Sequence, residues 1–332
     1  MTHTASLVYR HNRVTRLTHW VNFVAFTILL MSGLQIFNAH PHLYWGNSSD
    51  PGTAFFSISA TGPPANQRGY VELLGLRIDT TGLLGLQYTQ TGINQQAFPG
   101  WLTIPSYYWL AGGRHWHFFF AWLFVINGAL YLVYNLLNGH IRKFFLMPRD
   151  AAKIPAMTLY YLHLRNDSPQ EGEYNPLQKM AYTGVFLVLV PLVILSGLAM
   201  SPQLNQAFNW LPAVFGGRQS ARTIHFILTF AFIGFVVGHI FMVLTTGVIN
   251  NMRSMISGWY SEKLHFAGTP APVDMIETPV EAPAPVAPGQ PIGAENAEPP
   301  EQESREPDAA PAKDGEPAVD AEKVGGEKNA SK

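Results

Sequence analysis

Cysteine is absent from all 332 residues of the chain. This absence excludes disulfide bonds, thiolate-ligated iron–sulfur clusters, cysteine-based zinc sites and the covalent attachment of c-type haem. A metal or cofactor bound by this chain would therefore be held by histidine or by another ligand without a thiol group.

Charged residues are missing from four long apolar stretches. A transmembrane helix needs about 20 predominantly apolar residues, and each stretch is long enough. The first stretch is too long for the apolar core of a signal peptide, and no A-x-A cleavage pattern follows it. We therefore expect an all-α membrane protein with a four-helix transmembrane bundle, rather than four buried helices of a soluble protein. The predicted spans are Leu17–Asn38, His115–Leu137, Ala181–Ser201 and Thr223–Asn250.

Acidic residues are scarce in most of the chain and concentrated at its end. Residues 1–265 contain 16 Lys and Arg against 8 Asp and Glu, whereas residues 266–332 contain 5 against 14. The second part is mostly Ala, Pro, Glu, Gly and Asp, and it has too few apolar side chains to offset the entropy of ordering it. We predict a folded four-span domain over residues 17–265 and a disordered acidic tail over residues 266–332.

Basic residues predict the orientation in the membrane. Those on one side of the predicted spans are Arg10, Arg13, Arg16, Arg142, Lys143, Arg149, Lys153, Arg165, Lys179, Arg253 and Lys263. The opposite side has fewer, spread over longer loops. Because loops rich in Lys and Arg stay in the cytoplasm, both termini are expected there, including an N-terminal arm over residues 1–16.

A long outer segment, residues 39–114, separates the first two spans. Its Gly, Pro, Asn and Thr content, as in "SSDPG" and "TGPPANQRG", predicts turns and short irregular pieces. Its apolar clusters, "VELLGLRI", "LLGLQY" and "WLTIPSYYWL", predict that it packs against something. A loop resting on the membrane surface and a docking face for an external partner both remain open.

Five of the 12 histidines lie in the predicted spans. An ionisable group inside a bilayer is energetically expensive and usually functional. His19 and His239 lie near the cytoplasmic ends of their spans, whereas His115, His117 and His225 lie near the outer ends. The alternative is that they are interfacial residues of an aromatic belt formed with tryptophans. Histidines at matched depths favour ligands over a belt, and the belt tryptophans would be Trp20, Trp116 and Trp122.

The spacing of the two histidines in the fourth span is informative. Fourteen residues place the rings of His225 and His239 about 21 Å apart along the helix and within about 40° of the same direction. Two stacked haems would need this arrangement, with an opposing histidine at each depth. His19 is available to oppose His239, and either His115 or His117 to oppose His225. Because neighbours two apart point to nearly opposite sides of a helix, only one of these two faces the bundle, and the spacing does not choose.

Glycines and arginines near these histidines fit a bundle that admits flat rings. The glycines leave room for a ring, although close helix–helix packing explains them equally well. The arginines lie at span ends, where they could pair with haem propionates, although such residues are common at membrane edges. The residues concerned are Gly33, Gly128, Gly197, Gly234 and Gly238, with Arg16, Arg114 and Arg222.

Four segments together resemble the bacterial di-haem cytochrome b family. They are "RLTHWVNFVAFTILLMSGLQIF" at 16–37, "RHWHFFFAWLFVINGALYLVY" at 114–134, "YNPLQKMAYTGVFLVLVPLVILSGLAMSP" at 174–202 and "GGRQSARTIHFILTFAFIGFVVGHIFMVL" at 216–244. This cytochrome b561-like family includes the cytochrome b subunits of nickel–iron hydrogenase, formate dehydrogenase and thiosulfate reductase. The branch it most resembles is the cytochrome b/b6-domain subunit that accompanies a molybdopterin-dependent oxidoreductase. The resemblance covers residues 10–260 and not the tail.

The resemblance implies the cofactors and their ligands. It implies that the bundle encloses two b-type haems, with iron ligated by His19, His117, His225 and His239. The implied pairs are His117 with His225 on the outer side and His19 with His239 on the inner side. His115 takes the place of a basic residue and would neighbour a propionate.

The implied function is electron transfer in the bacterial inner membrane. Two imidazoles and the porphyrin nitrogens fill all six positions of an iron, so each haem would move single electrons. The resemblance implies quinone or quinol exchange at one end and a periplasmic redox subunit, molybdopterin-dependent, at the other. Nucleic acid is not expected as a partner. The alternatives are a stand-alone quinol-oxidising cytochrome b and, in a different class, a non-redox transporter or scaffold.

Overall fold

The structure of the chain is a computed structural model. It describes residues 7–63, 66–90, 92–139, 145–162, 164–167, 169 and 175–261, and these belong to one compact unit. The predicted acidic tail, residues 266–332, lies outside the described residues, as do residues 1–6 of the predicted N-terminal arm.

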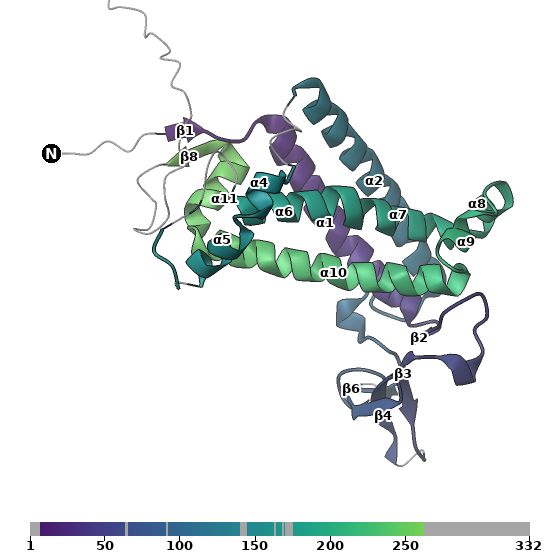
Figure 1. The fold of residues 1–332 in the computed structure, drawn as a ribbon. Helices are drawn as coiled ribbons and strands as arrows, with labels where there is room; N and C mark the ends of the chain where they lie inside the picture. Colours follow the sequence, from purple (N-terminus) through teal and green to yellow (C-terminus); the bar gives the residue numbers. More distant parts are fainter. Residues whose placement is uncertain are drawn as a thin grey trace, which may run out of the picture. The chain divides into compact units, whose positions relative to one another are not determined.

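Four helices of the described chain are long and apolar enough to cross a membrane (Figure 1). They are α1 (Arg13–Phe37), α2 (Leu110–Leu137), the continuous helix Pro176–Ala199, and α10 (Arg218–Thr245). Each begins four or five residues before its predicted span, because an apolar run marks the part inside the membrane and not the whole helix. In α1 the first turn is set by Asn12, whose side chain accepts a hydrogen bond from the Thr15 amide at 2.8 Å.

The third membrane helix contains a local irregularity. It consists of α6 (Pro176–Gly184), a π-helical turn η4 (Val185–Leu189) and α7 (Val190–Ala199). Pro191 lacks the amide hydrogen that would bond the carbonyl of Leu187, and its ring crowds that carbonyl. A wider π turn just before the proline relieves this conflict.

The fourth membrane helix is shorter than predicted at its end. The predicted span ran to Asn250, but α10 ends at Thr245 and a separate helix, α11 (Val248–Ser257), follows. Gly247 lies between them with a φ of 101°, a conformation that favours glycine and breaks the helix. The last three residues of the predicted span, Val248–Asn250, therefore belong to α11.

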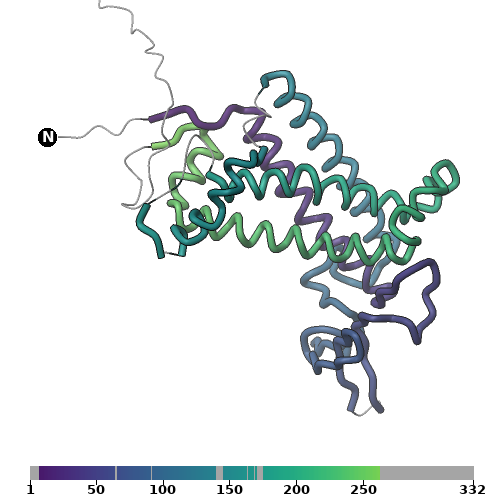
Figure 2. The backbone as a smooth tube through the Cα atoms, viewed as in Figure 1, coloured from purple at the N-terminus to yellow at the C-terminus, as the bar shows by residue number. Residues whose placement is uncertain are grey.

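The two ends of the described chain meet at one end of the bundle. Strand β1 (Leu7–Tyr9) pairs antiparallel with β8 (Trp259–Ser261), and Figure 2 shows the two segments side by side. Helix α11 is held to α1 by Trp20, whose indole nitrogen donates to the Met255 carbonyl at 3.1 Å. The inner ends of α1 and α10 are thereby tied together.

The described chain is mostly helical, as predicted, but residues 39–114 contain β-strands that the prediction of an all-α protein with an irregular outer loop did not include. A four-stranded antiparallel sheet has the order β2-β3-β4-β5, and a hairpin joins β6 to β7. Leu74 and Gly75, both with positive φ, form the tight turn between β4 and β5. The strands are β2 (His42–Leu43), β3 (Phe56–Thr61), β4 (Arg68–Leu73), β5 (Leu76–Asp79), β6 (Gln87–Thr89) and β7 (Gly92–Asn94).

Short helices complete the connections. The outer segment contains η1 (Pro51–Thr53) and η3 (Gly100–Leu102); α4 (Pro148–Ala151) and α5 (Ile154–Tyr161) precede the third membrane helix; α8 (Pro202–Ala207) and α9 (Leu211–Val214) precede α10. Near the start of α6, Lys179 pairs with Asp150 of α4 at 3.0 Å. This pair joins the loop to the inner end of the third membrane helix.

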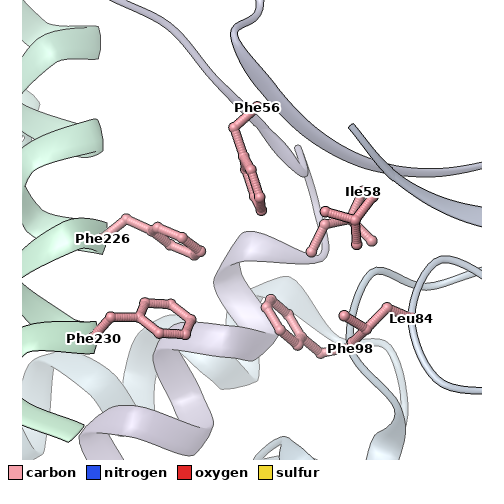
Figure 3. Close-up of a pocket in the computed structure, with 7 residues that line it drawn as sticks. Phe56, Ile58, Leu84, Phe98, Phe226 and Phe230 are labelled. Atoms are coloured by element: carbon pink, nitrogen blue, oxygen red, sulfur yellow. The ribbon is translucent and has the colours of Figure 1, made fainter. Parts of the chain in front are cut away.

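The outer sheet packs on the membrane helices through aromatic rings. Phe37 at the end of α1 stacks on Phe226 of α10 with ring centroids 4.6 Å apart. Figure 3 shows Phe226 and Phe230 of α10 pointing toward side chains of the sheet and its loops. Between them lies an open hollow of about 370 Å³, lined by Phe56, Ile58, Val71, Leu84, Phe98, Phe226 and Phe230.

The membrane helices are arranged as two pairs. Helix α1 packs along α2, and α7 packs along α10. The α1–α2 pair is joined by Asn127, which donates to the Thr18 carbonyl at 2.9 Å and to the Asn22 side chain at 2.8 Å. Such hydrogen bonds hold membrane helices together where no hydrophobic driving force acts between them. Across the centre the pairs face each other through rings, including Phe26 and Phe232 with centroids 6.0 Å apart.

Candidate functional site

The structure brings two histidines together near the ends of the membrane helices that adjoin the segment over residues 39–114. His117 of α2 and His225 of α10 have ring centroids 6.2 Å apart, and we call them the outer pair. They come from different helix pairs, so their rings meet across the centre of the bundle. His115 lies elsewhere on α2 and is exposed.

The His117 ring is held against α1 by its Nδ1 atom. This atom lies 3.1 Å from the Leu29 carbonyl oxygen and 3.2 Å from the Ser32 hydroxyl oxygen. Because a carbonyl can only accept, Nδ1 carries the proton and Nε2 is left with a free lone pair. The ring lies so close to α1 that a Cβ atom added to Gly33 would be 3.4 Å from its Cε1 atom.

The His225 ring is held against α7 in the same way. Its Nδ1 atom lies 3.0 Å from the Val193 carbonyl oxygen and 3.1 Å from the Ser196 hydroxyl oxygen. A Cβ atom added to Gly197 would be 3.3 Å from its Cε1 atom. Both rings of the outer pair are therefore Nδ1–H donors with an unprotonated Nε2.

Sequence reasoning missed the two serines of this arrangement. The signal is a repeat in the first and third spans, "LLMSGL" at 29–34 and "VILSGL" at 193–198. In each copy the first residue supplies the carbonyl, the serine supplies the hydroxyl and the glycine gives the ring room. The repeat can be found in the sequence, but its meaning depends on knowing which histidine each helix faces.

A second pair of histidines meets nearer the other end of the bundle. His19 of α1 and His239 of α10 also have ring centroids 6.2 Å apart, and we call them the inner pair. The Nδ1 atom of His19 is buried and has no hydrogen-bond partner in the described part of the chain. Phe235, one turn before His239, stacks on the His239 ring with centroids 6.2 Å apart.

The separation within each pair fits two imidazoles on opposite sides of one metal ion. A bond of about 2 Å from metal to nitrogen and roughly 1 Å from nitrogen to ring centre, on both sides, give about 6 Å. The outer pair also has the tautomer that metal ligation requires, with the second nitrogen donating to a carbonyl. The described residues hold no group of three or more His, Asp or Glu that could bind a metal unaided. Two histidines per centre suit an iron whose remaining ligands come from a porphyrin.

The three predicted propionate partners have different surroundings. Arg16 donates to the Ile256 carbonyl, while its Nε atom is buried without a partner among the described residues. Arg114 is exposed and lies over the Phe118 ring at 5.7 Å. Arg16, one turn before His19, thus has a buried donor beside the inner pair that is unpaired among the described residues.

Arg222 fastens the outer segment to α10. Its guanidinium donates to the carbonyl of His42 at 2.9 Å and also to the carbonyl of His40. It lies over the Phe37 ring at 5.5 Å. A role for Arg222 toward a propionate stays a prediction, since both terminal nitrogens bind the backbone.

The five predicted glycines divide into two groups. Gly33 and Gly197 lie against the outer-pair imidazoles, where an added Cβ would be in tight contact. At Gly128, Gly234 and Gly238 an added Cβ would meet no other atom within 4 Å in the described structure. Close helix–helix packing is therefore not seen at these three, and open space remains beside the helix there.

Acidification is expected to loosen the outer segment from α10. Burial lowers the pKa of both His40 and His42, and the charge of Arg222 lowers it further. His40 also stacks on Tyr44 with centroids 5.6 Å apart. Because the pKa of each histidine is lower in the folded chain than the ordinary 6.5, the folded state favours the neutral imidazole. This contribution to the free energy of unfolding is complete above pH 6.5 and is lost as the pH falls through the pKa of the folded state.

Amide hydrogen exchange in β3 and β4 tests this, measured at about pH 7.5 and pH 5.5, on either side of the ordinary histidine pKa of about 6.5. We expect faster exchange at the lower pH after correction for intrinsic rates. The double variant His40→Gln, His42→Gln should show a smaller difference between the two conditions. An equal pH response in wild type and double variant would contradict the prediction.

Comparison with known proteins places the chain in a family. The sequence profile of the family described as "Prokaryotic cytochrome b561" matches residues 10–258. A protein of Azospira oryzae with the provisional name protein-methionine-sulfoxide reductase subunit YedZ1 is 28% identical over 229 residues, covering 69% of this chain and 86% of that protein. A protein of Escherichia coli with the provisional name cytochrome YdhU is 33% identical over 134 residues, covering 37% of this chain and 48% of that protein. No solved structure matches the chain.

Proposed function

The chain belongs to the prokaryotic cytochrome b561 family, and we propose that it binds two b-type haems and links the quinone pool to a periplasmic oxidoreductase subunit. Membership makes it a multi-pass membrane protein that binds haem b and transfers electrons as part of an oxidoreductase system. The proposal adds the number of haems, their ligands, the quinone and the partner.

The observation that carries the proposal is the pair of matched histidine contacts. His117 and His225 would ligate the outer haem, and His19 and His239 the inner haem, each pair at 6.2 Å between ring centroids. A haem held by two of these imidazoles would supply one-electron transfer, since no iron position would be left for a substrate. The chain's own residues hold the rings of the outer pair in place.

The proposed orientation puts the inner pair toward the cytoplasm of a bacterium and the outer sheet in the periplasm. It rests on the basic residues near β1, α11 and the second-to-third connection, which the positive-inside rule keeps in the cytoplasm. The membrane would be the inner membrane, with both termini on its cytoplasmic side.

The partner would dock on the outer side. The name of the Azospira oryzae relative, a subunit of a reductase, supports a role as one subunit of an assembly. The sequence resemblance supports a molybdopterin-dependent partner. Apolar side chains exposed on the outer segment and on the 201–222 connection are available for contact: Leu74, Leu76, Ile78, Trp101, Phe208, Trp210 and Val214.

The quinone would exchange electrons near the inner pair. A hollow of about 300 Å³ is lined by Trp20, Val21, Val24 and Leu123, and the Trp20 ring lies edge-on to the His19 ring with centroids 5.3 Å apart. An apolar wall with an indole fits the ring and chain of a quinone in the bilayer. Electron flow in either direction is compatible with this arrangement.

Two alternatives predict different behaviour. A stand-alone quinol-oxidising cytochrome b has no need for a folded outer sheet, which this chain has. A non-redox transporter or scaffold would bind no haem, and its histidine pairs would have no ion between them.

The test is a reduced-minus-oxidised spectrum of the purified chain, with haem quantified as the pyridine haemochrome. We expect about two b-type haems per chain, because each iron takes two axial histidines. The haems should exchange electrons with a quinol or a quinone analogue. One haem, or none, would overturn the two-haem proposal, and two haems that exchange no electrons with any quinol or quinone would overturn the quinone link.

A further inference from the structure

The two imidazoles of the outer pair are held by two copies of one hydrogen-bonding arrangement, and no such arrangement is found at the inner pair among the described residues. We infer that Ser32 and Ser196 are positioning residues that lower the midpoint potential of the outer haem relative to the inner one. This inference rests on the proposed function, since it concerns the haem between His117 and His225.

Each serine acts as a second acceptor for an Nδ1–H group. The Ser32 hydroxyl donates its own proton to the Ile28 carbonyl at 2.6 Å, so its oxygen is free to accept from His117 at 3.2 Å. The Ser196 hydroxyl lies 3.1 Å from the Val193 carbonyl and 3.1 Å from His225 Nδ1. Both serines are fully buried, so water does not compete for these contacts.

These acceptors change the imidazole as an iron ligand. An acceptor that draws the Nδ1 proton outward makes Nε2 a stronger electron donor, and a ligand of this kind becomes more basic. A more basic axial ligand stabilises ferric over ferrous iron and lowers the reduction potential. Each ring of the outer pair has a carbonyl and a hydroxyl as acceptors, so the effect applies on both sides of one iron.

The inner pair lacks this arrangement. His19 Nδ1 is buried without a partner among the described residues. His19 is therefore a weaker donor than His117 and His225, and we expect the inner haem to be the one with the higher potential. Electrons delivered at the outer side would run downhill toward the inner side, where the quinone is proposed to bind.

Potentiometric titration of the purified full chain tests the inference with the variants Ser32→Ala, Ser196→Ala and the double variant. We expect the more negative of the two redox waves to move to higher potential, furthest in the double variant, while the other wave stays. A tenfold rise in the reduced-to-oxidised ratio of one haem corresponds to about 59 mV. Thr27→Ala is the matched control, because its hydroxyl bonds only the Phe23 carbonyl in the same helix.

Two further measurements keep the inference testable if the serine-to-alanine variants fail to retain haem. Cysteine is close to serine in size and a weak acceptor, so Ser32→Cys should shift the same wave by less. In the wild-type chain, infrared difference spectra with ¹⁵N-labelled histidine, poised at each wave, should show stronger Nδ1–H hydrogen bonding for the more negative haem. Unmoved waves, movement of the more positive wave, or equal hydrogen bonding at both haems would overturn the inference. A chain with no haem would instead overturn the proposed function.

Discussion

Replacing His225 by alanine is expected to lower the haem content from about two per chain to about one and to remove the outer haem. The reason is geometric: His225 opposes His117 at 6.2 Å, and each iron needs both imidazoles for tight binding. His117→Ala should give the same spectrum, because it removes the other ligand of the same haem. The measurement is the pyridine haemochrome of the purified variants together with their low-temperature difference spectra.

Replacing either histidine of the inner pair is expected to remove the inner haem. His19→Ala and His239→Ala should each remove the other haem and leave the outer one. His115→Ala is the matched control, since this histidine is two residues from His117 but exposed on another side of α2. It should keep both haems. If His117→Ala and His225→Ala removed different haems, or if His115→Ala behaved like His117→Ala, the proposed pairing would be wrong.

Much of the membrane domain could be predicted from the sequence, because its determinants are local. Uncharged runs long enough to cross a bilayer identify the four spans without knowledge of their neighbours. The spacing of His225 and His239 along one helix gives their depth and face. The choice between His115 and His117 is different, since it depends on how α2 is rotated about its axis. The structure brings His117 opposite His225, which spacing alone could not decide.

The outer sheet could not be predicted because its strands are short and carry little alternation. Strand β5 has four residues and lies at the sheet edge, where all of them are exposed. The cluster "VELLGLRI" predicts an apolar patch that packs against something, whereas in the structure Gly75 within it forms part of the β4–β5 hairpin turn. The end of α10 at Gly247 was missed for a related reason: a single glycine in an apolar run is a weak signal until its positive φ is known.

Replacing Gly33 or Gly197 by valine is expected to remove the outer haem. The fall in haem content per chain should be close to that caused by replacing one of the ligand histidines. An added Cβ would lie 3.4 Å from the His117 ring at Gly33 and 3.3 Å from the His225 ring at Gly197. A methyl group at that distance forces a shift of a few tenths of an ångström, whereas the γ carbons of valine need the volume that the ring occupies. The imidazole must then move away from the helix that orients it, and the hydrogen bonds of Nδ1 to the carbonyl and the serine are lost.

The alanine variants and the valine variants should therefore differ in how many haems they retain. Gly33→Ala and Gly197→Ala should keep two haems with a small spectral change, while the valine variants keep one, as measured by the haem-to-protein ratio and the difference spectrum. Gly184→Val is the matched control in the third membrane helix, because an added Cβ there meets no other atom within 4 Å of the described structure and this glycine is not one predicted to admit a haem. A valine variant that retained an unaltered outer haem would show that the imidazole is not held against α1 or α7, and would remove the basis for assigning its tautomer. Loss of the inner haem instead would show that Gly33 and Gly197 do not lie beside the imidazoles of the outer haem.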